Sequence, residues 1–400
     1  MPTNTGGVRE AVILAAGQGT RLWPLTHCRP KPLIPVLNRP FLQHQLELME
    51  SCGIRRTVLI IGYMKEAIED WLSTFQTRMQ IITRVQREAR GTGDAINTAR
   101  GSVNGDFVVM NGDILLDRNG LMAMLESGST SVAAKEVDNP QDFGVFEVKR
   151  DSVVGVVEKA ENPPSNLANV GCYVFENEIF DRIDTTPPNP KRGEVEITDT
   201  LQGMVDEKLH IRCFRVSTWN ELGKPWDVIN LTETYIRGEA GEGDFIRRGR
   251  GRAGVKLGNG TLIEGDSKVI GPSLVGRDCR IEGGAVVGPN CSVGNGTIIR
   301  GARILGSVIM DGCQLEPGAR VEYSVLASGV VVERDVSLLS KNPDGSPVML
   351  DIKGQPTNSG RTRLGSIIGD QSRIGSGTSL DPGTMLAPRT SVPAKGFLHK

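Results

Sequence analysis

The C-terminal third of the chain carries a six-residue repeat, which restricts the fold of that region more tightly than any other feature does. An aliphatic residue stands at every sixth position, and a small residue stands two positions before most of them. Six residues provide one short strand and a turn, so successive repeats stack their strands and align one aliphatic ladder. We therefore predict a prism of stacked strands with an aliphatic interior. The ladder comprises Ile263, Val269, Val275, Ile281, Val287, Val293, Ile299 and Leu305 and, after a register shift, Ile368, Ile374, Leu380, Leu386 and Val392.

This repeat resembles the hexapeptide repeat of left-handed parallel β-helices. Glycine often follows a ladder residue, as at Gly276 and Gly288, and Cys279 and Cys291 fit the small core positions inside the coils. Related β-helices form trimers. The resemblance therefore implies a homo-oligomer, a trimer or a multiple of it, that assembles through this region.

The composition of the chain changes upstream of the repeat. Tyr323 and Phe397 are the only aromatic residues after position 250, and a Gly/Arg-rich stretch precedes the repeat. We interpret this stretch as a linker. The predicted organisation is a first domain at 1–236, a linker at 237–254 and the β-helix at 255–400.

Residues 1–236 alternate between short apolar runs and helix-like segments. This alternation predicts an α/β domain with a doubly wound, mostly parallel, Rossmann-like sheet. In such sheets ligands bind beyond the carboxyl ends of the strands, and the motifs below fall at such ends. The expected strands include Ala11–Leu14, Val58–Ile61, Ile81–Thr83 and Phe107–Met110, and the expected helices include Phe41–Cys52, Lys65–Phe75 and Gly93–Arg100.

A segment of small residues follows the first apolar run. Its backbone N–H groups can approach phosphate oxygens closely, and Arg21 and Lys31 add two positive charges. The Walker A motif is excluded because Thr20 and Arg21 follow the second glycine, and the dinucleotide fingerprint is excluded because Leu22 replaces its third glycine. We predict a polyphosphate site. Its nucleotide-binding residues are Leu14, Ala15, Ala16, Gly17, Gly19 and Thr20.

The complete segment resembles the signature of the sugar-1-phosphate nucleotidylyltransferases, and further motifs follow in that family's order. The resemblance assigns Gln86, Gly91 and Thr92 to the nucleotide base. A Gln amide donates and accepts, which matches the alternating acceptor and N–H of a pyrimidine edge. The base segment therefore favours UTP or dTTP over GTP.

The same resemblance implies a Mg²⁺ site. Asp113 follows a strand-like run and corresponds to the metal-binding Asp of the family, and a carboxylate there suits a cation that bridges phosphates. Glu221 occupies the position of a second metal ligand that is usually an Asp. Asp227, a few residues later, is the alternative second ligand.

A further group of residues resembles the sugar-phosphate side of the family's site. In the family these positions present a glycine backbone, a carboxylate and an amide to the hexose and a cation to its phosphate. The residues are Gly144, Glu158, Lys159, Asn169, Tyr173 and Glu196.

Together these motifs predict an enzyme that makes a UDP- or dTDP-sugar and pyrophosphate from a nucleoside triphosphate and a hexose 1-phosphate. We assign catalysis to Arg21, Lys31 and Asp113, through positioning and charge neutralisation. Three alternatives stay open. They are a bifunctional enzyme that also N-acetylates glucosamine 1-phosphate, a mannose-1-phosphate guanylyltransferase and a non-catalytic regulatory subunit.

The bifunctional alternative meets one obstacle in the sequence. The acetyltransferase-bearing relatives use a His in the β-helix as the base for the attacking amine. The four histidines here are His27, His44, His210 and His399, and none lies inside the coils. We therefore interpret the β-helix as structural and oligomerising.

Charge and cysteine usage limit the other partners. A formal net charge of −1 argues against nucleic acid, and no apolar run is long enough to span a membrane. The seven cysteines show no C-x-x-C pairing, which is typical of reduced thiols in a cytoplasmic protein.

Overall fold

A computed structural model describes residues 7–190, 193–236 and 254–398, and it divides the chain into two compact units. The first unit comprises Met1–Gln18 and Leu42–Glu221, and the second comprises Gly19–Phe41 and Leu222–Lys400. The predicted linker at 237–254 lies outside the described residues except for Gly254. The predicted domain boundaries stay a prediction.

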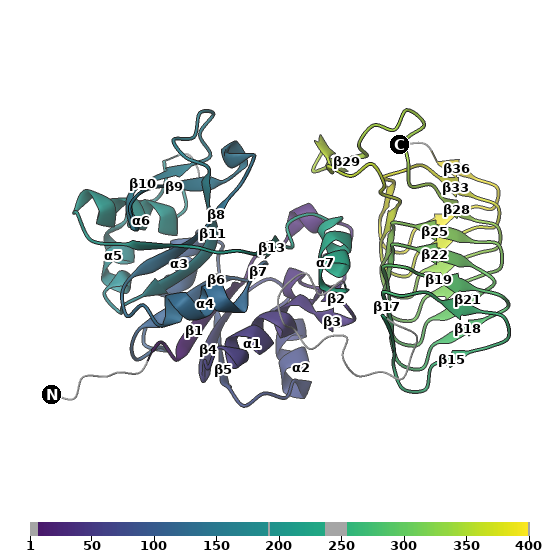
Figure 1. Ribbon diagram of the computed structural model, residues 1–400, viewed down its shortest axis with the longest axis horizontal. Helices are drawn as coiled ribbons and strands as arrows, with labels where there is room; N and C mark the ends of the chain where they lie inside the picture. The colour runs from purple at the N-terminus through teal and green to yellow at the C-terminus, as the bar shows by residue number, and fades with distance from the viewer. Residues whose placement is uncertain (1–6, 191–192, 237–253, 399–400) are drawn as a thin grey trace. The chain divides into compact units, whose positions relative to one another are not determined.

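The first unit is built on a nine-stranded sheet with the order β5-β4-β1-β6-β11-β8-β12-β10-β9 (Figure 1). Strands β5, β4, β1 and β6 are mutually parallel, as the β-α alternation predicts. From β11 onward most pairs are antiparallel. The strands are β1 (Glu10–Ala15), β4 (Arg56–Ile61), β5 (Gln80–Val85), β6 (Phe107–Asn111), β8 (Ser131–Glu136), β9 (Gly144–Lys149), β10 (Ser152–Glu158), β11 (Leu167–Phe175) and β12 (Arg212–Arg215).

A small second sheet and the helices complete this unit. Strand β7 (Ile114–Leu116) pairs antiparallel with β13 (Trp219–Glu221). The three expected helices are present, the third ending at Asn97 rather than Arg100. The helices are α1 (Phe41–Ser51), which begins at the division between the units, α2 (Lys65–Thr74), α3 (Thr92–Asn97), α4 (Arg118–Leu125), α5 (Ile179–Thr185) and α6 (Ile197–Asp206), with the 3-10 turn η3 (Pro140–Asp142).

The core of the first unit lies along the middle strands. Ala11, Val12 and Ile13 of β1 are fully buried because the strand has a neighbour on each side. Phe107 of β6 stacks on Phe180 of α5 at 5.3 Å between ring centroids. This rigid centre holds the carboxyl ends of β1 and β6, where the predicted site begins.

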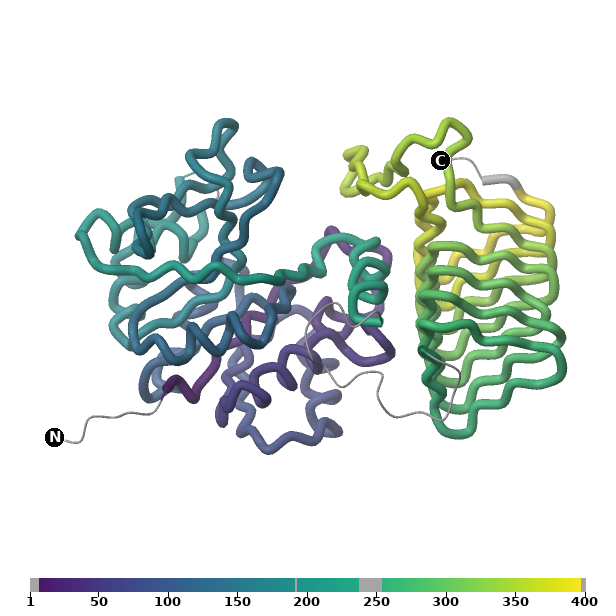
Figure 2. The backbone as a smooth tube through the Cα atoms, viewed as in Figure 1, coloured from purple at the N-terminus to yellow at the C-terminus, as the bar shows by residue number. Residues whose placement is uncertain are grey.

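In the second unit, residues 255–398 form three seven-stranded parallel sheets, consistent with the predicted left-handed β-helix (Figures 1 and 2). The first sheet contains β14 (Val255–Leu257), β17 (Ser273–Val275), β20 (Cys291–Val293), β23 (Val308–Ile309), β26 (Val325–Leu326), β31 (Ile367–Ile368) and β34 (Met385–Leu386). The second contains β15 (Leu262–Ile263), β18 (Arg280–Glu282), β21 (Ile298–Arg300), β24 (Gln314–Leu315), β27 (Val331–Val332), β32 (Arg373–Ile374) and β35 (Ser391–Val392). The third contains β16 (Lys268–Val269), β19 (Val286–Val287), β22 (Arg303–Leu305), β25 (Arg320–Glu322), β28 (Ser337–Leu338), β33 (Ser379–Leu380) and β36 (Phe397–Leu398).

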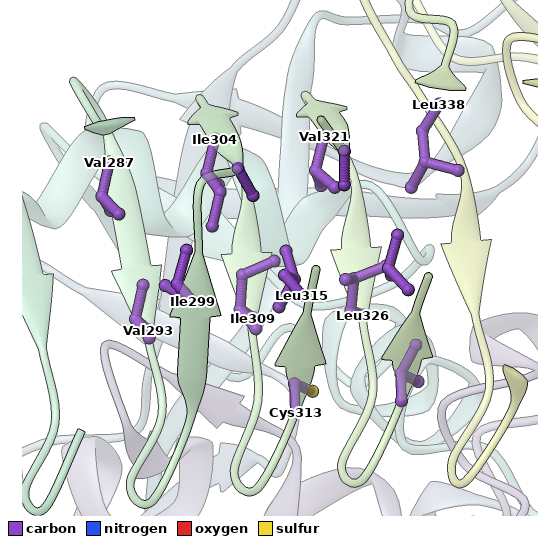
Figure 3. Close-up of a cluster of buried hydrophobic side chains, with 14 of the residues drawn as sticks. Val287, Val293, Ile299, Ile304, Ile309, Cys313, Leu315, Val321, Leu326 and Leu338 are labelled. Atoms are coloured by element: carbon purple, nitrogen blue, oxygen red, sulfur yellow. The ribbon is translucent and has the colours of Figure 1, made fainter. Parts of the chain in front are cut away.

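The predicted ladder forms the interior of these coils from Val269 onward, with one correction of register; Ile263, its first predicted residue, is 38% exposed in the first coil. Figure 3 shows its side chains, among them Val293 and Ile299, gathered between the strands. Ile304, at 1% exposure, occupies the rung that we expected for Leu305, because Val287 pairs with Ile304 and this coil is one residue shorter. The small residue two positions earlier is then Ala302, which is fully buried, so the repeat rule holds in the corrected register. Cys279 and Cys291 are fully buried, as predicted.

The second unit also contains elements that precede or interrupt the coils. A hairpin of β29 (Met349–Ile352) and β30 (Gln355–Asn358) is inserted between β28 and β31. No helix among the described residues is long and apolar enough to cross a membrane. The remaining elements are η1 (Thr20–Leu22), η2 (Lys31–Leu33), β2 (Pro35–Val36), β3 (Arg39–Pro40) and α7 (Asp227–Ile236).

Candidate functional site

The first part of the predicted phosphate loop follows β1 in the first unit. The Gly112 N–H donates to the Leu14 carbonyl at 2.9 Å, and a Cβ on Gly112 would overlap that carbonyl. Ala15 is buried and Ala16 half-buried, whereas Gly17 is exposed and has no atom within 4 Å of the place where a Cβ would stand. The chain therefore leaves the sheet as bare backbone that faces open space.

The second part of the loop belongs to the second unit. Gly19 adopts a left-handed φ of 63°, and its carbonyl accepts a hydrogen bond from Thr26 Oγ1 at 3.1 Å. The side-chain stem of Lys31 packs against Gly19, where an added Cβ would meet Lys31 Cβ at 2.8 Å. Thr20 and Arg21 are exposed on η1. This segment therefore places the side chain of Lys31 against Gly19, two residues before the exposed Arg21.

The predicted base-binding residues lie after β5 and at the start of α3. Gln86 Nε2 donates to Asp94 Oδ2 at 2.8 Å and to the Gly91 carbonyl at 3.3 Å, so its amide donors are engaged within the protein. Gly91 has a φ of 103°, and a Cβ there would overlap the Val195 carbonyl. Asp94 was not predicted from the sequence, although it directly follows the Gly-Thr-Gly segment.

Thr92 connects the base segment to the sugar segment. Its hydroxyl donates to Glu196 Oε2 at 2.9 Å and accepts the Ile197 N–H at 3.0 Å. The Gly93 N–H donates to the Val195 carbonyl at 2.8 Å. The structure therefore brings together residues about a hundred positions apart that the sequence assigned to different halves of one site.

The remaining sugar-side residues gather on β9, β10 and β11. Gly144 pairs with Glu158 across the β9–β10 ladder, and a Cβ on Gly144 would meet Glu158 Oε2 at 2.6 Å. Tyr173 O–H donates to Asn169 Oδ1 at 3.0 Å. Burial, and more weakly the carboxylates of Glu158 and Glu196, raise the pKa of the Tyr173 phenol. The phenol therefore stays neutral and orients the Asn169 amide.

Lys159 extends from the same corner into solvent. It is exposed, adopts a left-handed φ of 45°, and its N–H donates to the Phe143 carbonyl at 3.2 Å. The Phe143 ring contacts Trp219 of β13 edge-on at 5.1 Å between centroids. This aromatic pair, which the sequence did not reveal, links the sugar-side loop to the strand that carries Glu221.

One predicted metal ligand, Glu221, lies on β13, and the other, Asp113, lies in the turn before the neighbouring strand β7. Asp113 directly precedes β7, and Glu221 pairs in register with Ile114, the residue after Asp113. Asp117 fixes this pairing because its carboxylate accepts the N–H groups of Ser217 and Thr218, both at 3.0 Å. The sequence carried a signal for Asp117, since an Asp before a helix is a common N-cap, and it also accepts the Gly120 N–H of α4.

Asp227, the alternative second ligand, lies in the second unit, at the start of α7. Its Oδ2 accepts the N–H groups of Gly223 and Lys224 at 2.9 and 2.7 Å, and its Oδ1 accepts from Asn230. Burial raises its pKa despite these hydrogen bonds. The carboxylate therefore organises the start of α7.

Comparisons with known proteins agree with this description. The chain matches the family model described as nucleotidyl transferase over residues 10–238, and the model described as GlmU-like, C-terminal hexapeptide over residues 288–341. It is 33% identical to the bifunctional protein GlmU of Methanococcus maripaludis, over 98% of this chain and 95% of that protein. It is 30% identical to the bifunctional sugar-1-phosphate nucleotidylyltransferase/acetyltransferase of Sulfurisphaera tokodaii, over 94% of each chain.

A solved structure resembles part of the molecule. The crystal structure of UDP-glucose pyrophosphorylase complexed with UDP-glucose matches with a TM-score of 0.52 and 25% identity, over 57% of this chain and 99% of that one. The family model covers more than half of the chain, and the two relatives match it along nearly their full lengths. The chain therefore belongs to the nucleotidyl transferase family and is a sugar-1-phosphate nucleotidyltransferase.

Proposed function

We propose that this enzyme transfers the nucleotidyl group of UTP or dTTP to glucose 1-phosphate or N-acetylglucosamine 1-phosphate. A phosphate oxygen of the sugar attacks the α-phosphorus in line, and the bond from the α-phosphorus to the oxygen bridging to the β-phosphate breaks. Pyrophosphate leaves with that bonding pair. The nucleophile is already ionised at neutral pH, so the protein's task is positioning and charge neutralisation.

The observation that carries this proposal is the bond between Thr92 and Glu196. It joins the base segment to the sugar segment at 2.9 Å, and Glu196 and Glu158 both influence the Tyr173 phenol. Two substrates that must react with each other require their binding residues in one place. The Thr92–Glu196 contact supports such a site.

Gln86 is proposed to select the base through its carbonyl oxygen. Because Asp94 and the Gly91 carbonyl take its N–H donors, Oε1 is the atom suited to accept a base N–H. The N3–H of uracil and of thymine is such a donor. This contact treats UTP and dTTP alike. The N1–H of guanine is another such donor, so the proposed preference for a pyrimidine rests on the resemblance of the base segment.

The charges of the triphosphate are assigned to Arg21 and Lys31. Arg21 is exposed on η1, and the stem of Lys31 packs against Gly19. We propose that both stabilise the triphosphate, and that Arg21 also stabilises the leaving pyrophosphate. The sugar phosphate is assigned to Lys159, which is also exposed.

The carboxylate pair of Asp113 and Glu221 fits Mg²⁺. The described residues contain no group of three or more His, Cys, Asp or Glu side chains that could enclose a metal. Mg²⁺ is usually held by one or two carboxylates together with substrate phosphates, and such a pair stands here on β13 and directly before its partner strand β7. When bound, the cation would neutralise phosphate charge.

The proposal is tested by a matrix of Mg²⁺-dependent pyrophosphate release. UTP, dTTP, GTP and ATP are each combined with the 1-phosphates of glucose, N-acetylglucosamine, glucosamine and mannose. Turnover with UTP or dTTP supports the proposal and names the sugar. Turnover only with GTP and mannose 1-phosphate overturns the assignment of a pyrimidine base, and no turnover at all favours a non-catalytic regulatory subunit.

A second candidate function is acetyl transfer to an amino sugar. The names of the two full-length relatives favour it, as does the GlmU-like model over residues 288–341. The sequence between 255 and 398 contains no His that could act as the base. The test is release of free thiol from acetyl-CoA in the presence of glucosamine 1-phosphate. Such release would establish the activity even though these residues contain no His.

We also propose that the β-helix assembles three copies of the chain or a multiple of three. Hexapeptide-repeat domains commonly self-associate, and the coil stack ends in exposed apolar residues such as Leu262, at 49% exposure. Sedimentation equilibrium measures the number of copies. A monomer or dimer would contradict the proposal.

A further inference from the structure

The segment that carries Arg21 and Lys31 contacts the β-helix within the second unit. Arg29 Nη2 forms an ion pair with Asp370 Oδ1 and lies 3.3 Å from Ser328 Oγ, and Nη1 lies 3.4 Å from Met310 Sδ. Met310, Ser328 and Asp370 follow β23, β26 and β31, which are successive strands of one sheet. One arginine therefore contacts three adjacent coils.

This ion pair is buried and specific. The side chains of Arg29 and Asp370 are 16% and 8% exposed. Asp370 Oδ1 also accepts the Ser328 N–H at 3.2 Å, which fixes the carboxylate to the neighbouring coil. A buried carboxylate that loses its cation is strongly destabilised, so the pair holds the loop and the coils together more firmly than a surface contact would.

The chain between Arg29 and Lys31 transmits this restraint. Pro30 and Pro32 flank Lys31 and restrict the backbone torsions around it. The Leu33 N–H donates to the Pro30 carbonyl at 2.9 Å, and the Ile34 N–H donates to the Lys31 carbonyl at 3.1 Å. Fixing Arg29 therefore limits the positions that Lys31 can adopt.

A second polar contact holds the other end of the segment. Asn38 Nδ2 donates to the Val293 carbonyl at 2.6 Å, and Asn38 Oδ1 accepts from Ser292 Oγ at 2.8 Å. Asn38 has a φ of 61° in the turn between β2 and β3. Asn38 and Arg29 both bind the sheet that contains β20, β23, β26 and β31, at different coils.

We propose that the β-helix positions the phosphate-binding loop through Arg29 and Asp370, so that Arg29 is a positioning residue for the nucleoside triphosphate. The inference rests on the proposed function, which assigns the triphosphate to Arg21 and Lys31. Without the ion pair, the loop populates its binding-competent arrangement less often. The apparent affinity for the nucleotide then falls in proportion to the fraction of molecules whose loop is in the binding-competent arrangement.

The test is the steady-state kinetics of Asp370→Asn, with the pyrimidine triphosphate varied at saturating sugar 1-phosphate. We expect KM for the triphosphate to rise about tenfold, because saturating nucleotide restores the competent loop, while kcat and KM for the sugar phosphate change less than twofold. A defect in folding alone would instead reduce the number of active enzyme molecules, which lowers the apparent kcat and leaves KM unchanged.

The matched control is Glu333→Gln. Glu333 pairs with Arg373 and accepts from Ser376, so it links the same coils as Ser328 and Asp370 without touching the loop. We expect its KM for the triphosphate to match the parent. Asn38→Gly, which keeps the turn conformation but removes both hydrogen bonds, should raise that KM by a smaller factor than Asp370→Asn does.

A double-mutant cycle tests whether Arg29 and Asp370 affect KM through their mutual contact or independently. If Arg29 and Asp370 act as a pair, Arg29→Met with Asp370→Asn raises KM no further than either change alone. Hydrogen exchange of residues 19–33, measured without nucleotide, should accelerate in Asp370→Asn and stay at the parent rate in Glu333→Gln. An unchanged KM together with unchanged exchange in an active parent overturns the inference. An inactive parent overturns the proposed function instead, and the exchange measurement still tests the restraint.

Discussion

The nine-stranded sheet of the first unit and the β-helix of the second bury apolar residues in different ways. Strand β1 pairs with β4 and β6, so Leu14 lies beside Ile60 and Asn111, residues far away in the sequence. In the β-helix each strand pairs with its counterpart one coil away, as Val275 does with Val293. The first core assembles distant segments, whereas the second repeats one local arrangement.

This difference explains where the candidate chemistry lies. Ends of unrelated strands meet at one edge of the sheet, and each end brings a different polar group. The repeat places the same small or aliphatic residue at every equivalent position, which makes a regular scaffold. The contact with Arg29 is made outside the ladder, by Met310, Ser328 and Asp370, which follow strands of three successive coils.

The largest effect is expected from a site residue of the first unit. Asp113→Asn removes a charge from the proposed metal pair while keeping the side-chain shape, so kcat/KM should fall about 10²–10⁴-fold. Pyrophosphate release measures the rate, and thermal unfolding measures the fold. The matched control is Asp138→Asn, an exposed position that should change neither. Equal rates for both variants would remove Asp113 from the mechanism.

The next largest effect is a loss of stability, and how far it spreads should differ between the two cores. Ile60→Ala in β4 and Ile304→Ala in β22 each delete a buried side chain and should destabilise the protein by about 2–5 kcal/mol. Hydrogen exchange should accelerate throughout the four parallel strands for Ile60→Ala. It should accelerate only in the coils next to β22 for Ile304→Ala, because repeat folds contact only their neighbours. Exchange that spreads over all coils would contradict this independence.

Two glycines sharpen the distinction between a ligand position and a packing position. Gly17 has open space where a Cβ would stand, so Gly17→Ala should leave stability unchanged and raise KM for the triphosphate about tenfold by obstructing a phosphate. At Gly112 the Leu14 carbonyl occupies that space, so Gly112→Ala should destabilise the unit by about 1–3 kcal/mol. An unchanged KM for Gly17→Ala would place the phosphates elsewhere.

The two regions also differed in how far the sequence predicted them. The ladder was predictable because each rung depends on residues six positions away. The register error, Leu305 for Ile304, arose where a coil loses a residue. Ile263 is exposed because it lies in the first coil, which has a neighbouring coil on one side. The residue ranges of the parallel strands were predictable from their apolar runs. The antiparallel pairing of β11 with β6 was not, because no local pattern encodes partners so distant along the chain.

The candidate site was predicted as a set of residues without its internal contacts. Motif order pointed to Thr92 and Glu196 separately, but their hydrogen bond depends on the whole fold. The sequence marks Asp117 only as a helix N-cap, because its bond to the Thr218 N–H joins residues a hundred positions apart. Asp94 was missed because its bond to Gln86 needs the turn that brings the two side chains together. Contacts of this kind orient the residues that the motifs identify.

The smallest expected effect concerns Asp117, which holds β13 against β7. Burial raises the pKa of its carboxyl, but the N–H groups of Gly120, Thr218 and Ser217 outweigh burial and lower it overall. A depressed pKa contributes stability that is present above the unfolded value of about 3.9 and is lost as the pH falls through the lower folded value. Asp117→Asn should therefore reduce the free energy of unfolding by about 1 kcal/mol at pH 7.

The pH dependence distinguishes this carboxylate from a simple packing group. Urea unfolding at pH 7, 5 and 3 should show the difference between Asp117→Asn and the parent persisting to about pH 5 and shrinking as Asp117 itself becomes protonated. Asp138→Asn, the exposed control, should follow the parent throughout. A difference independent of pH would mean that shape rather than charge locks β13. Strand β13 carries Glu221, so a pH-dependent difference would show that the charge of Asp117 holds a predicted site residue in place. In the first unit a single carboxylate would then fix a strand position that the β-helix fixes by its repeat.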